Sequence, residues 1–269
     1  MNVGRRRIWA VLAAVSLAVV RAHAGEVVDQ GAQAHGSIAV AAAADLKFAL
    51  DEIVRAFSNE RPGIMVSVTY GSSGSFFAQL ARGAPFDVFL SADAEYARRL
   101  IDAGHALDPA FPYAVGRLAL WALRSTGLDV EGSGIAVLGD PRVRRVAIAN
   151  PRHAPYGRAA EAALRSLGFY ERVADKIVIG EDVAQAAQFV QSGAAEVGLV
   201  ALSLASGPKL RAQGVYWRVP EGAHPRLEQA GVIMRTTLNP NAARAFRDFV
   251  VGLHGRAVLE RYGFGLPSR

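Results

Sequence analysis

The sequence predicts an α/β protein with two lobes, and three observations support this prediction. From Gly36 onward, short apolar or β-branched runs alternate with segments of helical period, which is typical of mixed, mostly parallel sheets flanked by helices. The alternation occurs as two consecutive series, the second of which begins near Val115. The length of 269 residues and the 51% hydrophobic content allow two modest cores. We therefore expect two lobes with a ligand cleft between them.

The first 24 residues read as a secretory signal peptide. Three arginines, Arg5 to Arg7, precede an uncharged apolar run from Ile8 to Val20, and Ala22-His23-Ala24 is a small-x-small cleavage pattern. The run is shorter than the roughly 20 residues of a spanning helix. Cleavage after Ala24 lowers the formal net charge of +6 by four, to +2, and leaves no basic run that would indicate nucleic acid binding. We expect a soluble, exported protein.

The first series predicts three strand and helix units. Leu46, Leu50, Ile53 and Phe57 lie on one face of its first helix, and Asp45 is expected to cap that helix. The four phenylalanines of the next two units are expected in the core rather than at a ligand. The expected strands are 37–43, 64–70 and 86–92, and the expected helices are 45–60, 75–83 and 94–104.

The second series repeats the same alternation, and its helices carry clean apolar stripes. After it come a further strand and two final helices between Asn241 and Tyr262. The expected strands are 115–123, 145–151, 176–180, 196–202, 215–220 and 230–234, and the expected internal helices are 157–168 and 182–193.

Residue content excludes several kinds of chemistry. The sequence has no cysteine, which excludes disulfides, thiolate metal sites and cysteine catalysis. The six histidines are scattered without the spacing of a zinc site, and an isolated histidine reads as a surface residue. The Walker and dinucleotide-binding glycine motifs are both absent from the sequence, so we expect no cofactor.

The stretch Tyr70 to Ser75, YGSSGS, follows a predicted strand and is rich in hydroxyl groups. A nucleophile elbow requires G-x-S-x-G, and Ser75 stands where the last glycine belongs, which disfavours serine hydrolysis through Ser73. Gly71 and Gly74 allow close approach to the backbone around Ser73. The stretch therefore suits a small oxyanion.

Four junctions share one feature: a strand ends, a small or polar residue follows, and a helix begins. Helix N-termini present free N–H groups and the positive end of the helix dipole, so several converging ends can bind an anion without Lys or Arg. Capping for stability alone is the alternative reading of each junction. The junctions are Ala44-Asp45, Ser72-Ser73-Gly74, Pro155-Tyr156-Gly157 and Asp182-Val183.

With these junctions in view, the sequence resembles the periplasmic molybdate-binding proteins of ABC transporters, which have the type II periplasmic binding protein fold. The matching stretches occur in the family's order and cover nearly all of the chain beyond the signal peptide. They are AAAADLKFALDEI, YGSSGSFFAQLARGAPFDVFLSAD, IANPRHAPYG, GEDVAQAAQFVQSGAAEVGLVAL and LERYGFGLP.

The resemblance implies two lobes that close over molybdate or tungstate. The chain would cross between the lobes near Tyr113 and again near Gln229, which gives a first lobe of 37–114 plus 230–266 and a second lobe of 115–229. The ligand contacts would come from Ala44, Asp45, Ser73, Tyr156 and Val183. Ala44, Tyr156 and Val183 would contribute mainly backbone N–H groups. The only metal bound would be the one inside the oxyanion.

Two positions depart from the family's pattern. Many relatives have Ser or Asn where this chain has Asp45, and a Tyr that some relatives carry is Ala201 here. Three hypotheses stay open for Asp45. It caps its helix through the N–H groups of Lys47 and Phe48, which we favour, or it binds as a protonated acid, or the anion is taken up with a proton. Arg158 is read as solvated rather than as an anion ligand.

The expected function is therefore capture rather than catalysis. The protein would be a periplasmic monomer that delivers molybdate, and also tungstate, to an ABC transporter permease in the inner membrane, without binding nucleic acid. The alternatives are a binding protein for another oxyanion such as sulfate, and an exported serine hydrolase that uses Ser73.

Overall fold

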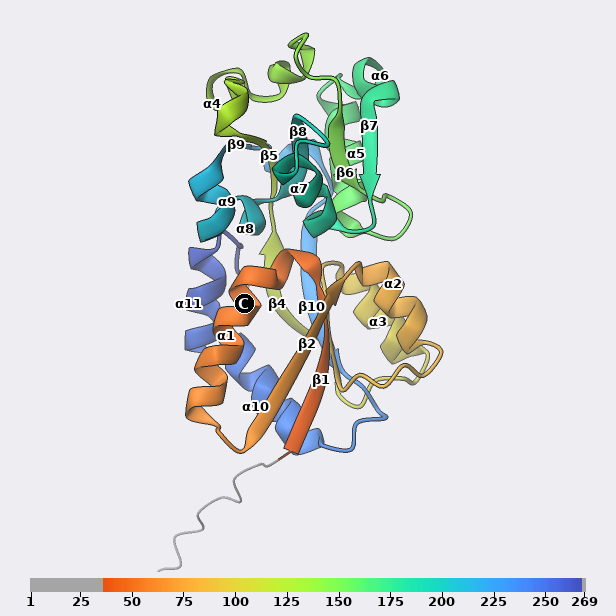
Figure 1. Ribbon diagram of the computed structural model, residues 1–269. Helices are drawn as coiled ribbons and strands as arrows, with labels where there is room; N and C mark the ends of the chain where they lie inside the picture. The colour runs from red at the N-terminus through yellow and green to blue at the C-terminus, as the bar shows by residue number, and fades with distance from the viewer. Residues whose placement is uncertain (1–35, 268–269) are drawn as a thin grey trace, which may run out of the picture. The chain divides into compact units, whose positions relative to one another are not determined.

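The computed structural model describes residues 36–267, which form two five-stranded sheets flanked by helices (Figure 1). We call each sheet with its helices a lobe. The predicted signal peptide, residues 1–24, lies outside the described residues. No helix within residues 36–267 is both long and apolar enough to cross a membrane.

The first sheet has the strand order β2-β1-β3-β10-β4. β1 pairs in parallel with β2 and β3, while β10 lies between β3 and β4 and runs antiparallel to both. The sheet is therefore mixed. Its strands are β1 (Gly36–Ala43), β2 (Ile64–Gly71), β3 (Val88–Ser91), β4 (Phe111–Gly116) and β10 (Leu227–Ile233).

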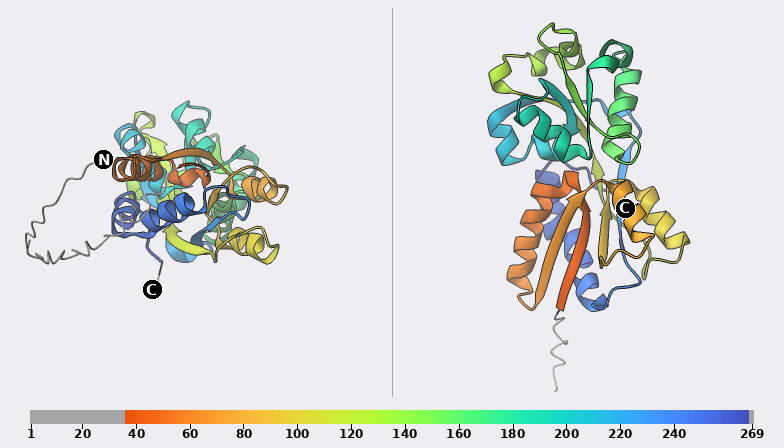
Figure 2. Two further views of the ribbon diagram at one scale, coloured as in Figure 1. Left: turned by 90° about the horizontal axis from the view of Figure 1, so that it is seen from below. Right: turned by 45° about the vertical axis from the view of Figure 1, so that its right-hand side comes forward.

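Alternate residues of β1 serve two separate cores on opposite faces of this sheet. Ile38, Val40 and Ala42 pack with α1, α10 and α11, whereas Ala41 packs with α2 and α3. Figures 1 and 2 show these two groups of helices on either side of β1 and β2. The helices are α1 (Lys47–Glu60), α2 (Ser73–Leu80), α3 (Ala94–Asp102), α10 (Pro240–Val251) and α11 (Leu253–Arg261).

The phenylalanines of the first series lie in the core, as predicted. Phe76 and Phe89 are buried, and Phe77 and Phe86 pack against the same cluster. The ring of Phe76 meets Phe86 edge-on at a centroid distance of 5.6 Å. These aromatic side chains pack with residues of α2 and α3 in one hydrophobic cluster.

The second sheet has the order β7-β6-β8-β5-β9. β6 pairs in parallel with β7 and β8, and β5 runs antiparallel to β8 and β9. The strands are β5 (Leu118–Leu123), β6 (Val146–Ala149), β7 (Ile177–Gly180), β8 (Val197–Ala201) and β9 (Gly214–Arg218). The helices are α4 (Val130–Ser133), α5 (Pro155–Ser166), α6 (Tyr170–Val173), α7 (Val183–Gln191), α8 (Leu202–Ala205) and α9 (Pro208–Gln213).

The chain changes sheet twice. One expected strand, 115–123, is in fact parts of two strands, because β4 ends at Gly116 in the first sheet and β5 begins at Leu118 in the second. The return lies between β9 and β10, where Glu221–Ala223 form a short 3-10 helix. Both β4 and β10 belong to the first sheet over their whole lengths, so the expected lobe limits at 114/115 and 229/230 fall inside these two strands.

Candidate functional site

Strand register brings the four junctions together in two pairs. In the first sheet, Ala43 at the end of β1 lies opposite Gly71 at the end of β2, so Ala44 and Ser73 emerge side by side. In the second sheet, Ala149 of β6 lies opposite Gly180 of β7, so the loops leading into α5 and α7 are neighbours. Both pairs lie at the carboxyl ends of their strands, where ligands bind in α/β proteins.

The four junctions line one small cavity. All five residues predicted for the site border it, together with Ser72, Ala92 and Asp182. The cavity volume is about 10 Å³, so little free space is left between the residues of the two lobes that line it. The predicted site residues that line it are Ala44, Asp45, Ser73, Tyr156 and Val183.

The first turns of helices from both lobes border this cavity. Ser73 and Val183 are the first residues of α2 and α7, and Tyr156 is the second residue of α5 after Pro155. N–H groups in the first turn of a helix have no acceptor within their own helix. The Asp182 carboxylate accepts from the N–H groups of Ala184 and Gln185, at 2.8 and 2.9 Å, and so leaves the Val183 N–H available.

The Ser73 hydroxyl is fixed by one hydrogen bond. Its oxygen accepts from the Ala92 N–H at 2.9 Å, and the side chain is buried. Because this bond occupies a lone pair and not the hydroxyl hydrogen, Ser73 keeps an O–H donor for a ligand in the cavity.

Asp45 does not cap a helix, so the favoured hypothesis for this residue was wrong. It lies in the 3-10 turn Ala44–Leu46 that precedes α1, and neither that turn nor α1 has a side-chain cap. Instead its Oδ2 accepts a hydrogen bond from Nε2 of Gln229 at 2.6 Å. Burial raises the pKa of Asp45 from 3.8 to about 6, although the Gln229 hydrogen bond and the Tyr156 hydroxyl oppose this shift.

The phenol of Tyr156 lies beside this carboxyl rather than in solvent. Its hydroxyl is buried and makes no hydrogen bond, and burial near Asp45 raises the pKa of Tyr156 well above its usual range. A Cβ atom on Gly116 would lie 2.4 Å from the Tyr156 hydroxyl oxygen and 2.8 Å from Nε2 of Gln229. A glycine at the end of β4 is thus needed to make room for both side chains.

Gln229 and Gly116 were not predicted as part of the site. Gln229 is buried on β10, within a strand whose inward positions are otherwise apolar. A polar side chain at an inward strand position was the signal in the sequence, because a buried amide must find partners.

A second set of contacts ties the lobes together at the rim of the cavity. Ser72 caps α2, and its Oγ lies 2.8 Å from Nδ1 of His153 and 3.0 Å from the His153 carbonyl oxygen. The Gly74 N–H also donates to that carbonyl oxygen at 2.9 Å. His153, read from the sequence as a surface residue, therefore joins the loop before α5 to the start of α2.

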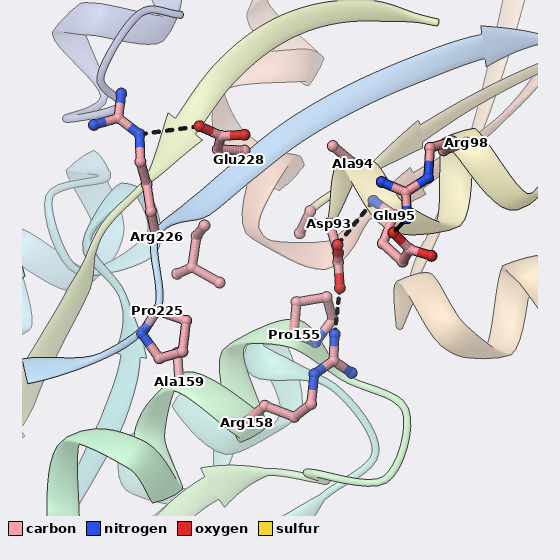
Figure 3. A pocket seen from close by; sticks show the side chains of 12 residues that line it. Asp93, Ala94, Glu95, Arg98, Pro155, Arg158, Ala159, Pro225, Arg226 and Glu228 are labelled. Carbon is pink, nitrogen blue, oxygen red and sulfur yellow. Dashed lines mark hydrogen bonds and ion pairs between the residues drawn. The ribbon is translucent and has the colours of Figure 1, made fainter. Parts of the chain in front are cut away.

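Arg158 forms another contact between the lobes, in a groove of about 530 Å³ that shares Ala92 and Pro155 with the cavity (Figure 3). Its guanidinium pairs with Asp93 at 2.5 Å and donates to the Tyr96 hydroxyl at 3.3 Å. Arg158 is partly exposed, as expected of a solvated residue, but it contacts the opposite lobe.

The geometry gives no support for hydrolysis. Within residues 36–267 the one hydrogen-bond partner of the Ser73 hydroxyl is the Ala92 N–H, so no base contacts this serine. Ser72 does contact His153, but the Ser72 side chain is buried and serves as the cap of α2. The described part of the chain also contains no group of three His, Cys, Asp or Glu side chains that could hold a metal ion.

Comparisons with known proteins agree with this description of the fold. The family model described as "Bacterial extracellular solute-binding protein" matches residues 38–265. The molybdate-binding protein ModA of Rhodobacter capsulatus is 37% identical over 86% of this chain and 89% of its own length. ModA of Azotobacter vinelandii is 36% identical over 85% of this chain and 90% of its own length.

Among solved structures, the periplasmic molybdate-binding protein of Azotobacter vinelandii matches with a TM-score of 0.80 and 32% identity. The match covers 86% of this chain and all of that one. The expected two-lobed periplasmic binding protein fold is therefore confirmed. The relatives are binding proteins and not enzymes.

Proposed function

Because the chain belongs to the family of bacterial extracellular solute-binding proteins, we propose that it captures molybdate, and also tungstate, for import by an ABC transporter. Two relatives that cover most of the chain are named for molybdate binding. The observation that carries the proposal is the convergence of helix N-termini from both lobes on one small cavity. Such a set of donors suits a tetrahedral oxyanion, since its oxygens can each accept from a separate N–H or O–H donor.

The proposed contacts divide between the lobes. Ala44 and Ser73 act from the first lobe, while Tyr156 and Val183 act from the second through their backbone N–H groups. Ser73 adds its hydroxyl. Asp45 borders the same cavity. We propose lobes of 37–114 plus 230–266 and of 115–229, except that residues 115–116 and 227–229 go with β4 and β10 in the first lobe.

The proposed setting is the periplasm. The signal-peptide pattern of residues 1–24 supports export, and the Azotobacter vinelandii protein of similar structure is named as periplasmic. The partner would be a permease in the inner membrane, which receives the oxyanion from a monomeric binding protein.

Thermal unfolding with added oxyanions tests this function. A ligand that binds only the folded protein raises the unfolding midpoint, and at about 100 times its Kd it adds about 2.7 kcal/mol of stability. We expect micromolar molybdate and tungstate to raise the midpoint and sulfate and phosphate to have no effect at the same concentration. A shift with sulfate alone would make the protein a sulfate-binding protein, and no shift with any of the four would remove the oxyanion function.

Small-angle scattering tests the role of the two lobes. A ligand that contacts both lobes favours the closed arrangement. The radius of gyration is expected to fall when molybdate is added. An unchanged radius, with binding shown by unfolding, would mean that the ligand-free protein is already closed or that one lobe alone holds the ligand.

A further inference from the structure

A cluster of unsatisfied polar atoms lies next to the cavity. Within residues 36–267, five buried side-chain polar atoms lack a hydrogen-bond partner, and three of them belong to Asp45, Tyr156 and Gln229. They are Oδ1 of Asp45, the hydroxyl of Tyr156 and Oε1 of Gln229. Buried polar atoms in folded proteins are nearly always hydrogen-bonded, so a cluster of three requires an explanation.

The three residues come from different parts of the fold. Asp45 lies in the turn before α1, Tyr156 in α5 of the opposite lobe, and Gln229 on the crossing strand β10. The Tyr156 hydroxyl is near enough to lower the pKa of Asp45, yet neither it nor Oδ1 completes a hydrogen bond in this geometry. In this arrangement an acidic side chain of one lobe therefore lies beside a phenol of the other.

No positive charge compensates the Asp45 carboxyl. Among the described residues, no Lys or Arg hydrogen-bonds or ion-pairs with it; its side-chain partner is the neutral amide of Gln229. On β4, the Tyr113 hydroxyl donates to the Ser91 carbonyl and not to Asp45. Several titratable groups on the other elements packed against this turn have partners elsewhere. On α1, Lys47 pairs with Asp51; on β2, Tyr70 donates to Asp51; at the start of α7, Asp182 caps the helix; and α8 has no titratable side chain.

An oxyanion in the cavity would add negative charge beside this carboxyl. Two unit charges about 4 Å apart repel by roughly 4 kcal/mol at an effective dielectric constant of 20, and a dianion about doubles this cost. An ionised Asp45 would thus oppose binding of the ligand that the surrounding N–H groups favour.

We propose that Asp45 takes up one proton when the oxyanion binds and meets the ligand as a neutral acid. This inference rests on the proposed oxyanion function and extends it to a proton-coupled site. The proton comes from solvent and is carried on Oδ1, since Oδ2 already accepts from Gln229. The new O–H then donates to a ligand oxygen or to the Tyr156 hydroxyl, so Oδ1 gains a partner.

Proton uptake makes the affinity depend on pH. Burial raises the pKa of Asp45 to about 6 without ligand, and nearby negative charge raises it further. Uptake is therefore expected above about pH 6, where the carboxyl of the ligand-free protein is ionised. Where one proton is taken up per ligand, the affinity rises about tenfold for each pH unit that the pH falls.

Isothermal calorimetry of the full mature protein with sodium molybdate tests the inference. Titrations at about pH 7 in two buffers of different ionisation enthalpy report the number of protons taken up, and titrations at about pH 6 and about pH 8 report the affinity. The wild type is expected to take up close to one proton. Asp45→Asn is expected to bind with no buffer-dependent heat, because its amide keeps an acceptor for Gln229 and cannot ionise. Glu228→Gln is the control. It removes an exposed carboxylate next to Gln229 on β10 and should keep the proton uptake of the wild type.

The possible outcomes distinguish failure of the proton coupling from failure of the proposed molybdate binding. Buffer-independent heats and a pH-independent affinity in the wild type would overturn proton coupling and leave molybdate capture intact. Equal proton uptake by wild type and Asp45→Asn would assign the proton to another group and also overturn it. Absence of molybdate binding by the wild type at every pH would overturn the proposed function and this inference with it.

Discussion

Arg158 on α5 and Asp93 at the start of α3 form an ion pair between the two lobes, with Nη2 and Oδ2 2.5 Å apart (Figure 3). The other oxygen of the same carboxylate caps α3 through the Glu95 N–H at 2.9 Å. The guanidinium also lies over the Tyr96 ring, 5.7 Å from its centroid. One side chain of the second lobe therefore contacts two residues of the first, Asp93 and Tyr96, beside the cavity and not inside it.

Arg158→Ala is expected to weaken molybdate binding by up to about fivefold. The pair is partly exposed, and such pairs contribute about 0.2–1 kcal/mol, which here favours the closed arrangement of the lobes. Stopped-flow kinetics should show a faster dissociation of the ligand. The matched control is Arg165→Ala on the same helix, whose ion pairs with Glu161 and Glu171 stay within the second lobe. Equal effects of both variants would show that the interlobe pair has no special role.

Gly74→Ala is expected to weaken molybdate binding on the order of tenfold or more, because crowding at a packed contact costs about 1–3 kcal/mol. An added Cβ would lie 2.5 Å from the His153 carbonyl oxygen and 2.8 Å from the Tyr96 hydroxyl. The first of these is backbone of the opposite lobe, so the penalty falls on the closed arrangement. Circular dichroism should show unchanged secondary structure.

The control for Gly74→Ala is Gly222→Ala, where an added Cβ meets nothing within 4 Å. Its affinity should equal that of the wild type. Wild-type affinity in Gly74→Ala itself would mean that the lobes bind the ligand without the close approach seen here.

Ser73→Ala is expected to weaken molybdate binding about 10- to 100-fold, since a hydrogen bond to a charged partner is worth roughly 1.5–3 kcal/mol. The substitution also removes the acceptor of the Ala92 N–H, so the ligand-free protein should lose about 1–3 kcal/mol of stability. Calorimetry and chemical denaturation measure the two effects. Ser67→Ala on β2 is the control, because that hydroxyl donates to the Ile38 carbonyl oxygen within the first lobe and outside the cavity. An unchanged affinity in Ser73→Ala would remove Ser73 from the site.

Asp45→Asn is expected to stabilise the ligand-free protein at neutral pH. The pKa of Asp45 is raised from 3.8 to about 6 in the folded protein, so the wild type loses stability as the pH rises through this range. The loss is complete above about pH 6 and amounts to about 3 kcal/mol at 1.36 kcal/mol per pKa unit. Urea denaturation of both proteins at about pH 4 and about pH 8 measures it. A difference in stability that is the same at both pH values would contradict the burial of an ionisable Asp45.

The local sequence pattern predicted most elements of the fold but not the way they are joined. Apolar periodicity is a property of neighbouring residues, so the strands and helices of both series appear close to their expected bounds. Periodicity does not show which sheet a strand enters. The run 115–123 therefore read as one strand, although Arg117 separates a strand of the first sheet from a strand of the second.

The sequence predicted which helix starts border the cavity, but it did not predict the contacts that the buried side chains make. The four helix starts follow from strand and helix boundaries, and all of them border the cavity. The role of Asp45 could not be predicted in this way, because a capping rule considers only the next few residues. Its partner Gln229 stands 184 positions away, and the partner of Ser72, His153, stands 81 positions away. Only the assembled sheets bring these pairs together.

The central place of β10 in the first sheet also bears on the order of folding during synthesis. All strands of the second sheet come from residues 118–218, so that sheet is complete before β10 has been made. The first sheet lacks β10, the strand that lies between β3 and β4, until Leu227–Ile233 have been made. Pairing of β10 with these strands then closes a long loop of chain. The second lobe, encoded in the middle of the chain, can therefore fold first. The first lobe is built from the two flanking parts of the chain and can complete its sheet only after β10 has been made.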